Sequence, residues 1–258
     1  MSLRARRADG FKGVRMKKTR LDKLLVDGGF FPDAQAALRA VLAREVKVGD
    51  AYATSAAQMV SADANVQVKS ENRFVSRGGW KLQGALDAFD QSVQGEHCID
   101  IGSSTGGFSD CLLQAGAASV VCVDVNYGQL AWKIRQDPRV KVFERTNIKT
   151  VVPQQIGAPF DVLVADLSFI GLAQLAGVFA KLSHKGSVFV GLVKPQFESH
   201  HDETEGGLVV DPDVRARTVR EVTTALEDVG FQVSGVVESS ITGRKAKNVE
   251  YLVRAVFR

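Results

Sequence analysis

The sequence contains little cysteine and no long hydrophobic run. Its 258 residues include three cysteines, and no two of them form the Cys-x-x-Cys spacing that recurs in zinc clusters and redox motifs. No apolar stretch approaches the ~18 residues that a membrane-spanning helix needs, and the arginine-rich start lacks the apolar stretch of a secretory leader. These absences argue against a disulfide framework, a metal site and a membrane-spanning segment, and they favour a reducing, cytoplasmic location.

The basic character of the chain is concentrated at its start. Of 33 basic and 29 acidic residues, seven and one fall within residues 1–18, which leaves 26 basic against 28 acidic residues in the rest. We therefore expect a disordered basic tail over 1–18 and a slightly acidic folded part. The length allows one or two domains, and the 45% hydrophobic and 24% charged residues are close to globular averages, which excludes disorder of the whole chain.

Residues 19–69 have the pattern of a small α+β domain. Leucines at helical spacing precede Gly28, and a second helical pattern follows Asp33. Two stretches that alternate like short, half-exposed strands come next, at 46–50 and 60–68. Two segments resemble the S4-type RNA-binding domain, Arg20-Leu21-Asp22-Lys23-Leu24-Leu25 and Val46-Lys47-Val48-Gly49.

The resemblance to an S4-type domain implies that basic side chains of this unit contact RNA. Gln35 and Arg44 depart from the pattern, because that domain usually has arginine and glycine at these positions. The alternative is an ordinary solvated basic face. The residues expected to contact RNA, including one arginine of the connector that follows, are Arg20, Lys23, Arg39, Arg44, Lys47 and Arg77.

After a connector at 70–79, strand and helix patterns alternate to the end of the chain. The best-marked helix runs from Pro212 to Val229, between a capping Asp211 and Gly230. The alternation predicts an α/β fold over 80–258, with a Rossmann-like, mostly parallel sheet of seven strands. The strands are expected at about 97–101, 119–125, 139–143, 160–166, 186–193, 231–238 and 249–257.

Polar residues or glycines end five successive strands of this predicted sheet. In an open α/β sheet ligands bind beyond the carboxyl ends of the strands, so these residues mark a candidate site. They are the segment Asp100–Phe108, Asp124, Asn147, Asp166 and Lys194.

The glycine-rich segment after the first strand narrows the class of ligand. Its glycines fit neither the phosphate-binding P-loop nor the dinucleotide fingerprint. Glycines suit a ligand that approaches the backbone closely, and the start of the helix behind them favours a carboxylate. Asp124, at the end of the next strand, can accept hydrogen bonds from both hydroxyls of a ribose. A ligand with a carboxylate and a ribose but no phosphate is S-adenosylmethionine, and the loop resembles the glycine motif of class I methyltransferases. A tight strand-to-helix turn is the alternative.

Asp100 has two interpretations, a ligand to the amino group of this methyl donor, which we favour, or a structural cap. The residues expected to bind the donor are Asp100, Gly102, Ser103, Ser104, Gly106, Gly107, Phe108, Asp124, Asn147 and Asp166.

The acceptor is predicted from the ends of the fourth and fifth strands. An exocyclic base amine usually requires an Asp or Asn-Pro-Pro-aromatic motif there, and carbon five of a pyrimidine requires a nucleophilic cysteine; neither is present. An alcohol such as a ribose 2′-hydroxyl remains. Lys194 is the candidate base, since burial and a second cation, Lys81, favour a neutral amine. Asp166 and Glu250 would orient the two amines.

Five segments together resemble the TlyA, or haemolysin A-like, family. The resemblance implies an S4-type domain followed by an FtsJ-like methyltransferase domain, and a Lys-Asp-Lys-Glu catalytic set at Lys81, Asp166, Lys194 and Glu250. It also implies 2′-O-methylation of a cytidine in ribosomal RNA, with rRNA or a ribosomal subunit as partner. The segments are Ser76-Arg77-Gly78-Gly79-Trp80-Lys81-Leu82, Asp100–Phe108, Asp166-Leu167-Ser168-Phe169-Ile170, Val193-Lys194-Pro195-Gln196-Phe197-Glu198 and Asn248-Val249-Glu250-Tyr251.

Two other functions stay open at this point. The haemolysin name suggests a membrane-lytic protein, for which the sequence offers no amphipathic helix or apolar hairpin, and we expect no stable membrane association. The other is an RNA-binding module that has lost catalysis. We further expect a mobile, solvated loop at 198–208, with Trp80 and Phe197 in core or loop packing rather than stacked on a flipped base. The sequence predicts no oligomeric state.

Overall fold

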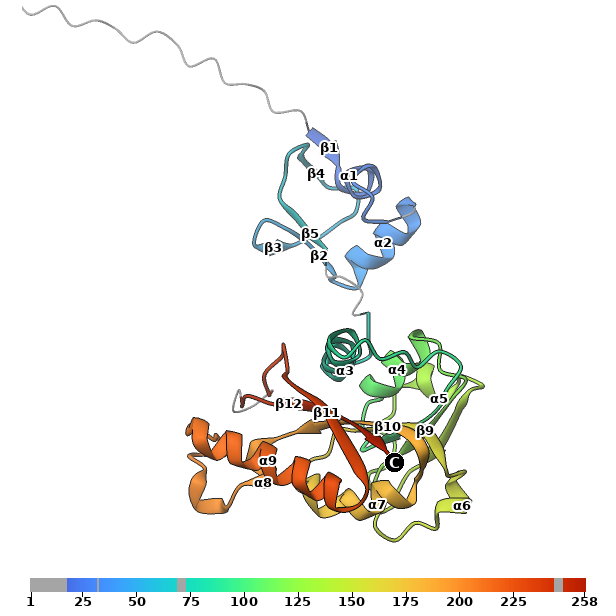
Figure 1. The fold of residues 1–258 in the computed structure, drawn as a ribbon. Helices are drawn as coiled ribbons and strands as arrows, with labels where there is room; N and C mark the ends of the chain where they lie inside the picture. Colours follow the sequence, from blue (N-terminus) through green and yellow to red (C-terminus); the bar gives the residue numbers. More distant parts are fainter. Residues whose placement is uncertain (1–17, 32, 69–72, 244–247) are drawn as a thin grey trace, which may run out of the picture. The chain divides into compact units, whose positions relative to one another are not determined.

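The computed structural model describes residues 18–31, 33–68, 73–243 and 248–258, so the expected basic tail lies outside the described residues apart from Lys18. The chain divides into two compact units, with the boundary between Arg73 and Phe74 (Figure 1).

The first unit packs two helices against short strands. Its elements are β1 (Lys18–Arg20), α1 (Leu21–Asp27), α2 (Ala34–Leu42), β2 (Val46–Val48), β3 (Ala51–Tyr52), β4 (Met59–Ser61) and β5 (Val66–Val68). Strand β2 lies between β3 and β5 in an antiparallel sheet. Leu21 and Leu25 of α1 are buried with Ala37 and Val41 of α2, which confirms the helical spacing predicted from the sequence.

Strand β1 is not predicted by the sequence pattern. Lys18 falls in the expected basic tail, but β1 pairs antiparallel with β4, with Thr19 opposite Val60. Three residues are too few for an alternating pattern, so the strand depends on a partner that lies far along the chain.

The second unit is built on a seven-stranded sheet in the order β11-β12-β10-β9-β6-β7-β8. Its strands are β6 (His97–Ile101), β7 (Ser119–Val123), β8 (Val140–Phe143), β9 (Phe160–Ala165), β10 (Ser183–Val193), β11 (Phe231–Glu238) and β12 (Tyr251–Phe257). Within this sheet β12 is antiparallel to both of its neighbours, β10 and β11, and every other neighbouring pair is parallel. The predicted Rossmann-like α/β fold is confirmed, and the strand positions agree closely with the expected ranges.

Helices cover both faces of this sheet (Figure 1). They are α3 (Arg77–Ala88), α4 (Gly107–Gln114), α5 (Trp132–Arg135), α6 (Pro153–Ile156), α7 (Ala176–Lys181), α8 (Pro195–Glu198) and α9 (Pro212–Asp228), with 3-10 turns at Ala173–Leu175 and His201–Glu203. Successive strand residues point to opposite faces: Cys98 packs in the cluster with Leu82 of α3, whereas Ile99 packs in the cluster with Leu226 of α9. The two hydrophobic clusters hold the sheet between its helices.

Helix α3 begins inside the stretch that we expected to be a connector. Gly78 and Gly79 have low helix propensity and argued for a loop. Gly79 is nevertheless needed in the helix, because a Cβ atom there would lie 2.3 Å from the side chain of the buried Phe74. Tertiary packing therefore extends the helix back to Arg77.

Candidate active site

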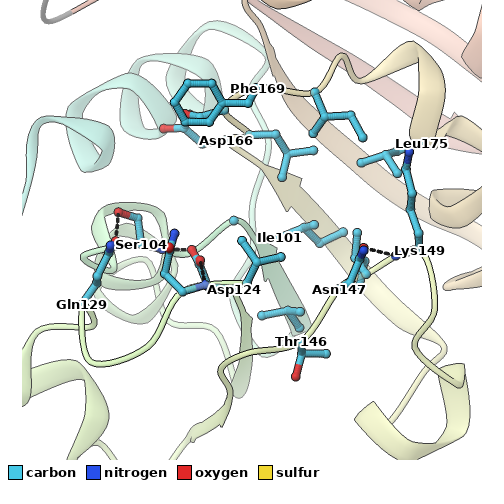
Figure 2. Close-up of a pocket in the computed structure, with 18 residues that line it drawn as sticks. Ile101, Ser104, Asp124, Gln129, Thr146, Asn147, Lys149, Asp166, Phe169 and Leu175 are labelled. Carbon is cyan, nitrogen blue, oxygen red and sulfur yellow. Dashed lines mark hydrogen bonds between the residues drawn. The ribbon is translucent and has the colours of Figure 1, made fainter.

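The carboxyl ends of strands β6, β7, β9 and β10 border two cavities that share Gly102, Ser104, Asp166 and Ser168. The larger has a volume of about 320 Å³ and the smaller about 170 Å³. Figure 2 shows the larger cavity, in which Asp166 and Phe169 lie across from Asp124 and Thr146. The predicted strand-end residues thus lie around one continuous region at one edge of the sheet.

Lys194 and Asp166 form the first of two ion pairs in this region. Lys194 directly follows β10 and Asp166 directly follows β9, and these strands are neighbours in parallel register. Lys194 Nζ lies 2.5 Å from Asp166 Oδ1 and donates a hydrogen bond of 3.4 Å to Ser168 Oγ. Both residues line the smaller cavity, and Lys194 is only 9% exposed. The amine is therefore buried, held by a carboxylate, and open to a ligand on one side.

Lys81 and Glu250 form the second ion pair, and both side chains are buried. Lys81 comes from α3, while Glu250 directly precedes β12. Because Val193 lies opposite Tyr251 in the pairing of β10 with β12, Glu250 is adjacent to Lys194 across neighbouring strands. The structure thus brings the four predicted residues to one edge of the sheet from four separate segments.

The glycine loop is shaped by the protein's own segments. Gly102 has φ +83°, and a Cβ atom there would lie 2.7 Å from the Asp166 carbonyl oxygen. A Cβ atom on Gly107 would lie 2.2 Å from Ser76 Oγ. We expected these glycines to admit a ligand, but the contacts that require them come from the strand β9 end and the start of α3. Gly106, with φ +89°, caps α4.

Asp100 has one oxygen in a structural cap and one oxygen without a partner among the described residues. Its side chain is fully buried, and Oδ2 accepts hydrogen bonds from the backbone N–H of Ser109 at 2.9 Å and from Ser109 Oγ at 2.6 Å. Oδ1 is also buried and has no hydrogen-bond partner within the described residues, and Asp100 lines the smaller cavity. Burial raises the pKa of this carboxyl to about 7, against the lowering effect of Ser109.

Asp124 and Asn147 lie at the larger cavity (Figure 2). Each Asp124 oxygen accepts one backbone N–H, Oδ2 from Ser104 at 2.7 Å and Oδ1 from Asn126 at 2.7 Å. An ionised carboxylate has further lone pairs, so both oxygens can accept from a ligand as well. Asn147 Oδ1 accepts from the backbone N–H of Lys149 at 3.0 Å.

The other predicted donor-binding residues divide between the two cavities. Ser103, Gly107 and Phe108 line the smaller one, where Phe108 is only 3% exposed and belongs mainly to the hydrophobic core. Ser104 lines both. Gly106 is not among the lining residues of either cavity.

Sequence reasoning missed several lining residues. Phe169 lines the larger cavity and is 92% exposed, with φ +69°. It lies in the quoted Asp166–Ile170 segment, but nothing in the residue type distinguished it from a core aromatic. Ser76 and Gly78 line the smaller cavity at the start of α3, within the range predicted to be a connector. The apolar wall of the larger cavity includes Ile101, Val123, Ile148 and Leu175.

The residues expected to contact RNA fall in both units. Arg20 forms a 2.5 Å ion pair with Asp22, and Lys47 lies over the ring of Tyr52 at 4.9 Å. Arg77 instead belongs to the second unit, where its guanidinium donates a 2.8 Å hydrogen bond to the Thr242 carbonyl. The remaining predicted residues of the first unit are all exposed, Lys23, Arg39 and Arg44.

The segment at 198–208 is largely exposed, as expected, and hydrogen bonds and an ion pair connect it to other parts of the second unit. Asn248 Oδ1 accepts from the Val209 N–H at 2.9 Å, and its amide donates to the Gly207 carbonyl at 2.8 Å. Glu203 forms a 2.5 Å ion pair with Arg217 of α9. The Asn248 contacts join the end of the segment to the chain just before Glu250, and the Arg217 contact joins its middle to α9.

Trp80 and Phe197 each contact another aromatic ring, and Trp80 is at the same time 42% exposed. Trp80 packs edge-on against Phe74 at 5.1 Å, and Phe197 lies 5.5 Å from Phe169.

The part of the chain that the structure describes contains no cluster of histidine, cysteine or carboxylate side chains suited to a metal ion. Among the described residues no helix is both long enough and apolar enough to cross a bilayer.

Comparisons with known proteins find methyltransferase relatives that match most of the chain. The FtsJ-like methyltransferase family matches residues 74–257. The 16S/23S rRNA (cytidine-2'-O)-methyltransferase TlyA of Mycobacterium tuberculosis is 42% identical over 240 residues, which cover 92% of this chain and 89% of the relative. Hemolysin A of Brachyspira hyodysenteriae is 35% identical, with 92% of this chain and 99% of the relative covered.

A solved structure is similar over almost the whole chain. This protein from Streptococcus thermophilus, which is named as a hemolysin, has a TM-score of 0.71 and 36% sequence identity, and the match covers 94% of this chain and 89% of that one. Since the matches span most of the chain and include the strand ends that form the site, the chain belongs to the FtsJ-like methyltransferases and, among them, to the TlyA family.

Proposed function

We propose that this protein transfers a methyl group from S-adenosylmethionine to the 2′-hydroxyl of a cytidine in ribosomal RNA. The observation that carries the proposal is the pair of buried Lys–carboxylate contacts, Lys194–Asp166 and Lys81–Glu250, beside a two-part cavity. The rRNA and the cytidine are taken from the name of the Mycobacterium tuberculosis relative.

The residues of the two cavities fit the methyl donor. The unpartnered, buried Oδ1 of Asp100 suits an amino group, and the two oxygens of Asp124 suit two ribose hydroxyls. The apolar wall of the larger cavity suits the face of an adenine ring. When bound, S-adenosylmethionine supplies an electrophilic methyl group.

Lys194 acts as the general base in this proposal. The ion pair with Asp166 at 2.5 Å is the ammonium form of Lys194, so Lys194 must first release this proton to solvent. The amine then takes the proton of the 2′-hydroxyl, and Asp166 stabilises the ammonium that forms again. The Lys81–Glu250 pair holds the second cation and the second carboxylate at the adjacent strand end. Most of the rate enhancement then comes from orientation of the hydroxyl, which the rigid strand ends favour.

We further propose that the first unit, residues 19–69 in the sequence prediction, is an S4-type domain that captures RNA. Its exposed basic side chains, such as Lys23 and Arg39, support electrostatic contact with phosphates. The partner is rRNA or an assembled ribosomal subunit, and the place of action is the cytoplasm. The hemolysin names of relatives support a membrane-active function more weakly, since no feature of the described site calls for a bilayer.

The proposal is tested by transfer of labelled methyl from S-adenosylmethionine to isolated rRNA and to ribosomal subunits. Lys194→Ala should lower the transfer rate by about 10²–10⁴-fold, the usual contribution of a general base, with donor affinity nearly unchanged. Lys181→Ala, which removes an exposed lysine at the end of α7, is the matched control. Wild-type activity in Lys194→Ala would remove Lys194 as the base, and a wild-type protein that labels no rRNA would contradict the function.

A further inference from the structure

The loop that carries Asp166 is anchored by a carboxylate outside the two ion pairs. This post-β9 loop, residues 166–172, runs from Asp166 to the start of the 3-10 turn Ala173–Leu175. Glu198, the last residue of α8, accepts a hydrogen bond from the backbone N–H of Leu172 at 2.6 Å and another from that of Ala173. Glu198 therefore binds the far end of the loop that begins at Asp166.

Gly171 shows how closely the loop is fitted to this carboxylate. A Cβ atom on Gly171 would lie 2.3 Å from Glu198 Oε2 and 3.0 Å from the Phe197 carbonyl oxygen. The φ angle of Gly171 is not in the left-handed region, so backbone strain does not require glycine here. The Glu198 carboxylate makes the closest of these contacts, and the Phe197 carbonyl makes a second, less severe one.

The loop needs such an anchor because its backbone is strained. Phe169 has φ +69°, a conformation that costs about 1–3 kcal/mol for a bulky residue and persists only where surrounding contacts hold it. Phe169 also projects its ring to solvent, so its own packing, a contact of 5.5 Å with Phe197, holds it weakly. The strained segment thus depends on its two ends, Asp166 and the Glu198 contact.

Glu198 and Lys194 lie at opposite ends of one short helix. Lys194 precedes α8 and Glu198 ends it, so the helix that starts beside the base also carries the anchor of the loop. Burial raises the pKa of Glu198 to about 7, while the two N–H donors oppose this shift. Glu198 is not among the residues that line either cavity, so its carboxylate acts through the loop.

We propose that Glu198 is a positioning residue that fixes the post-β9 loop against α8 and thereby holds Asp166 in register with Lys194. This inference rests on the proposed methyl transfer. Removal of the carboxylate leaves the N–H groups of Leu172 and Ala173 without their acceptor, and the strained loop relaxes.

The first test compares Glu198→Ala with Glu198→Gln in the full chain, with labelled S-adenosylmethionine and rRNA. Glu198→Ala should lower kcat by about 10–100-fold, as expected for a misplacement of about 1 Å, with a smaller change in the KM for RNA. Glu198→Gln keeps one carbonyl oxygen as acceptor and should recover several-fold of that loss. Glu227→Ala, on the exposed side of α9, is the control for loss of a carboxylate.

The second test is a double-mutant cycle with Gly171→Ala. In the wild-type background the added methyl group collides with Glu198 and should lower kcat as Glu198→Ala does. In the Glu198→Ala background the carboxylate is gone, so Gly171→Ala should add less than about a threefold loss. Losses of kcat that are smaller in the double variant than the sum of the two single losses would support the contact between Gly171 and Glu198 as their cause.

The outcomes separate the two proposals. Active wild-type protein with an unchanged kcat in Glu198→Ala would overturn the positioning role alone. So would additive losses in the cycle, or a loss in Glu198→Ala explained by its unfolded fraction and not relieved by Glu198→Gln. A wild-type protein that methylates no rRNA would overturn the proposed function and this inference with it.

Discussion

Charged residues lie both at the amino ends and at the carboxyl ends of the strands in the seven-stranded sheet, but their surroundings differ. We call these two sides of the sheet its amino-terminal edge and its carboxyl edge. At the amino-terminal edge Asp161 accepts from the His97 N–H at 2.8 Å and pairs with His184 at 3.0 Å, so these groups satisfy one another. At the carboxyl edge the Lys194–Asp166 pair lines a cavity, and Asp100 keeps a buried oxygen with no partner within the described residues. A charged cluster indicates a site when it adjoins space and an unsatisfied group.

The largest expected effect is at the Lys81–Glu250 pair. Lys81→Ala leaves Glu250 buried without its cation, and the free energy of unfolding should fall by about 3–5 kcal/mol, with loss of methyl transfer. Lys81→Met combined with Glu250→Leu removes both charges and should recover most of the stability but none of the activity. Urea denaturation and the methyl-transfer assay measure the two effects. Recovered activity in the apolar pair would show that the pair only supports the fold.

A comparison of two glycines tests the packing of the carboxyl edge. Gly102 has φ +83° and lies against the Asp166 backbone, whereas Gly95, at the amino-terminal edge, has φ +80° and no neighbour within 4 Å of an added Cβ. Gly102→Ala should lower stability by about 1–3 kcal/mol and donor affinity more than tenfold. Gly95→Ala carries the same backbone strain and should leave donor affinity unchanged, as measured by calorimetric titration. Equal donor affinities in both variants would contradict the assigned role of the loop.

The pH dependence of donor binding tests Asp100. Burial raises its pKa to about 7, and its ionised form attracts an ammonium group. Donor affinity should therefore increase as pH rises through about 7, with a slope of at most about tenfold per pH unit below it. Asp100→Asn should flatten this dependence. A flat profile for the wild type between about pH 6 and pH 8 would remove Asp100 as the partner of the amino group.

The smallest expected effect is at the amino-terminal edge. A hydrogen bond to the Lys185 carbonyl and the contact with Asp161 raise the pKa of His184 above 6.5 in the folded state. Its contribution to stability is therefore full below about pH 6.5 and is lost as pH rises through the raised value. Because the pair is partly exposed, His184→Gln should change the unfolding free energy by no more than about 1 kcal/mol. Melting temperatures at about pH 5.5 and pH 8.5 measure it, and a larger loss at the higher pH would contradict the assignment.

The sequence predicted the sheet and the strand ends well because both depend on local patterns. Short apolar runs that end at Asp124 or Asp166, or that contain Asp100 just before a glycine, are visible without any partner, and parallel strands necessarily bring such ends together. The meeting of Lys81 with Glu250 is a different case. The two are 169 residues apart, and only the family resemblance suggested their contact.

Features set by distant contacts were missed. Helix α3 extends through Gly78 and Gly79 because Phe74 packs beneath it, which helix propensity opposes. The 198–208 segment resembled a free loop by its glycines and charges, but Asn248 anchors its end. The Glu198 anchor was likewise hidden, since a carboxylate followed by serine and histidine has no local pattern of its own.

The position of the transferred methyl group tests the central claim most directly. Ribosomal RNA from cells without this protein would be treated with the purified protein and S-adenosylmethionine, digested, and analysed by nucleoside mass spectrometry. The paired lysines and carboxylates predict transfer to a 2′-hydroxyl, and the name of the Mycobacterium tuberculosis relative predicts cytidine as the nucleoside. We therefore expect 2′-O-methylcytidine with the wild type and with His184→Gln but not with Lys194→Ala. A methyl group on the base, or 2′-O-methylcytidine in undiminished yield with Lys194→Ala, would contradict it.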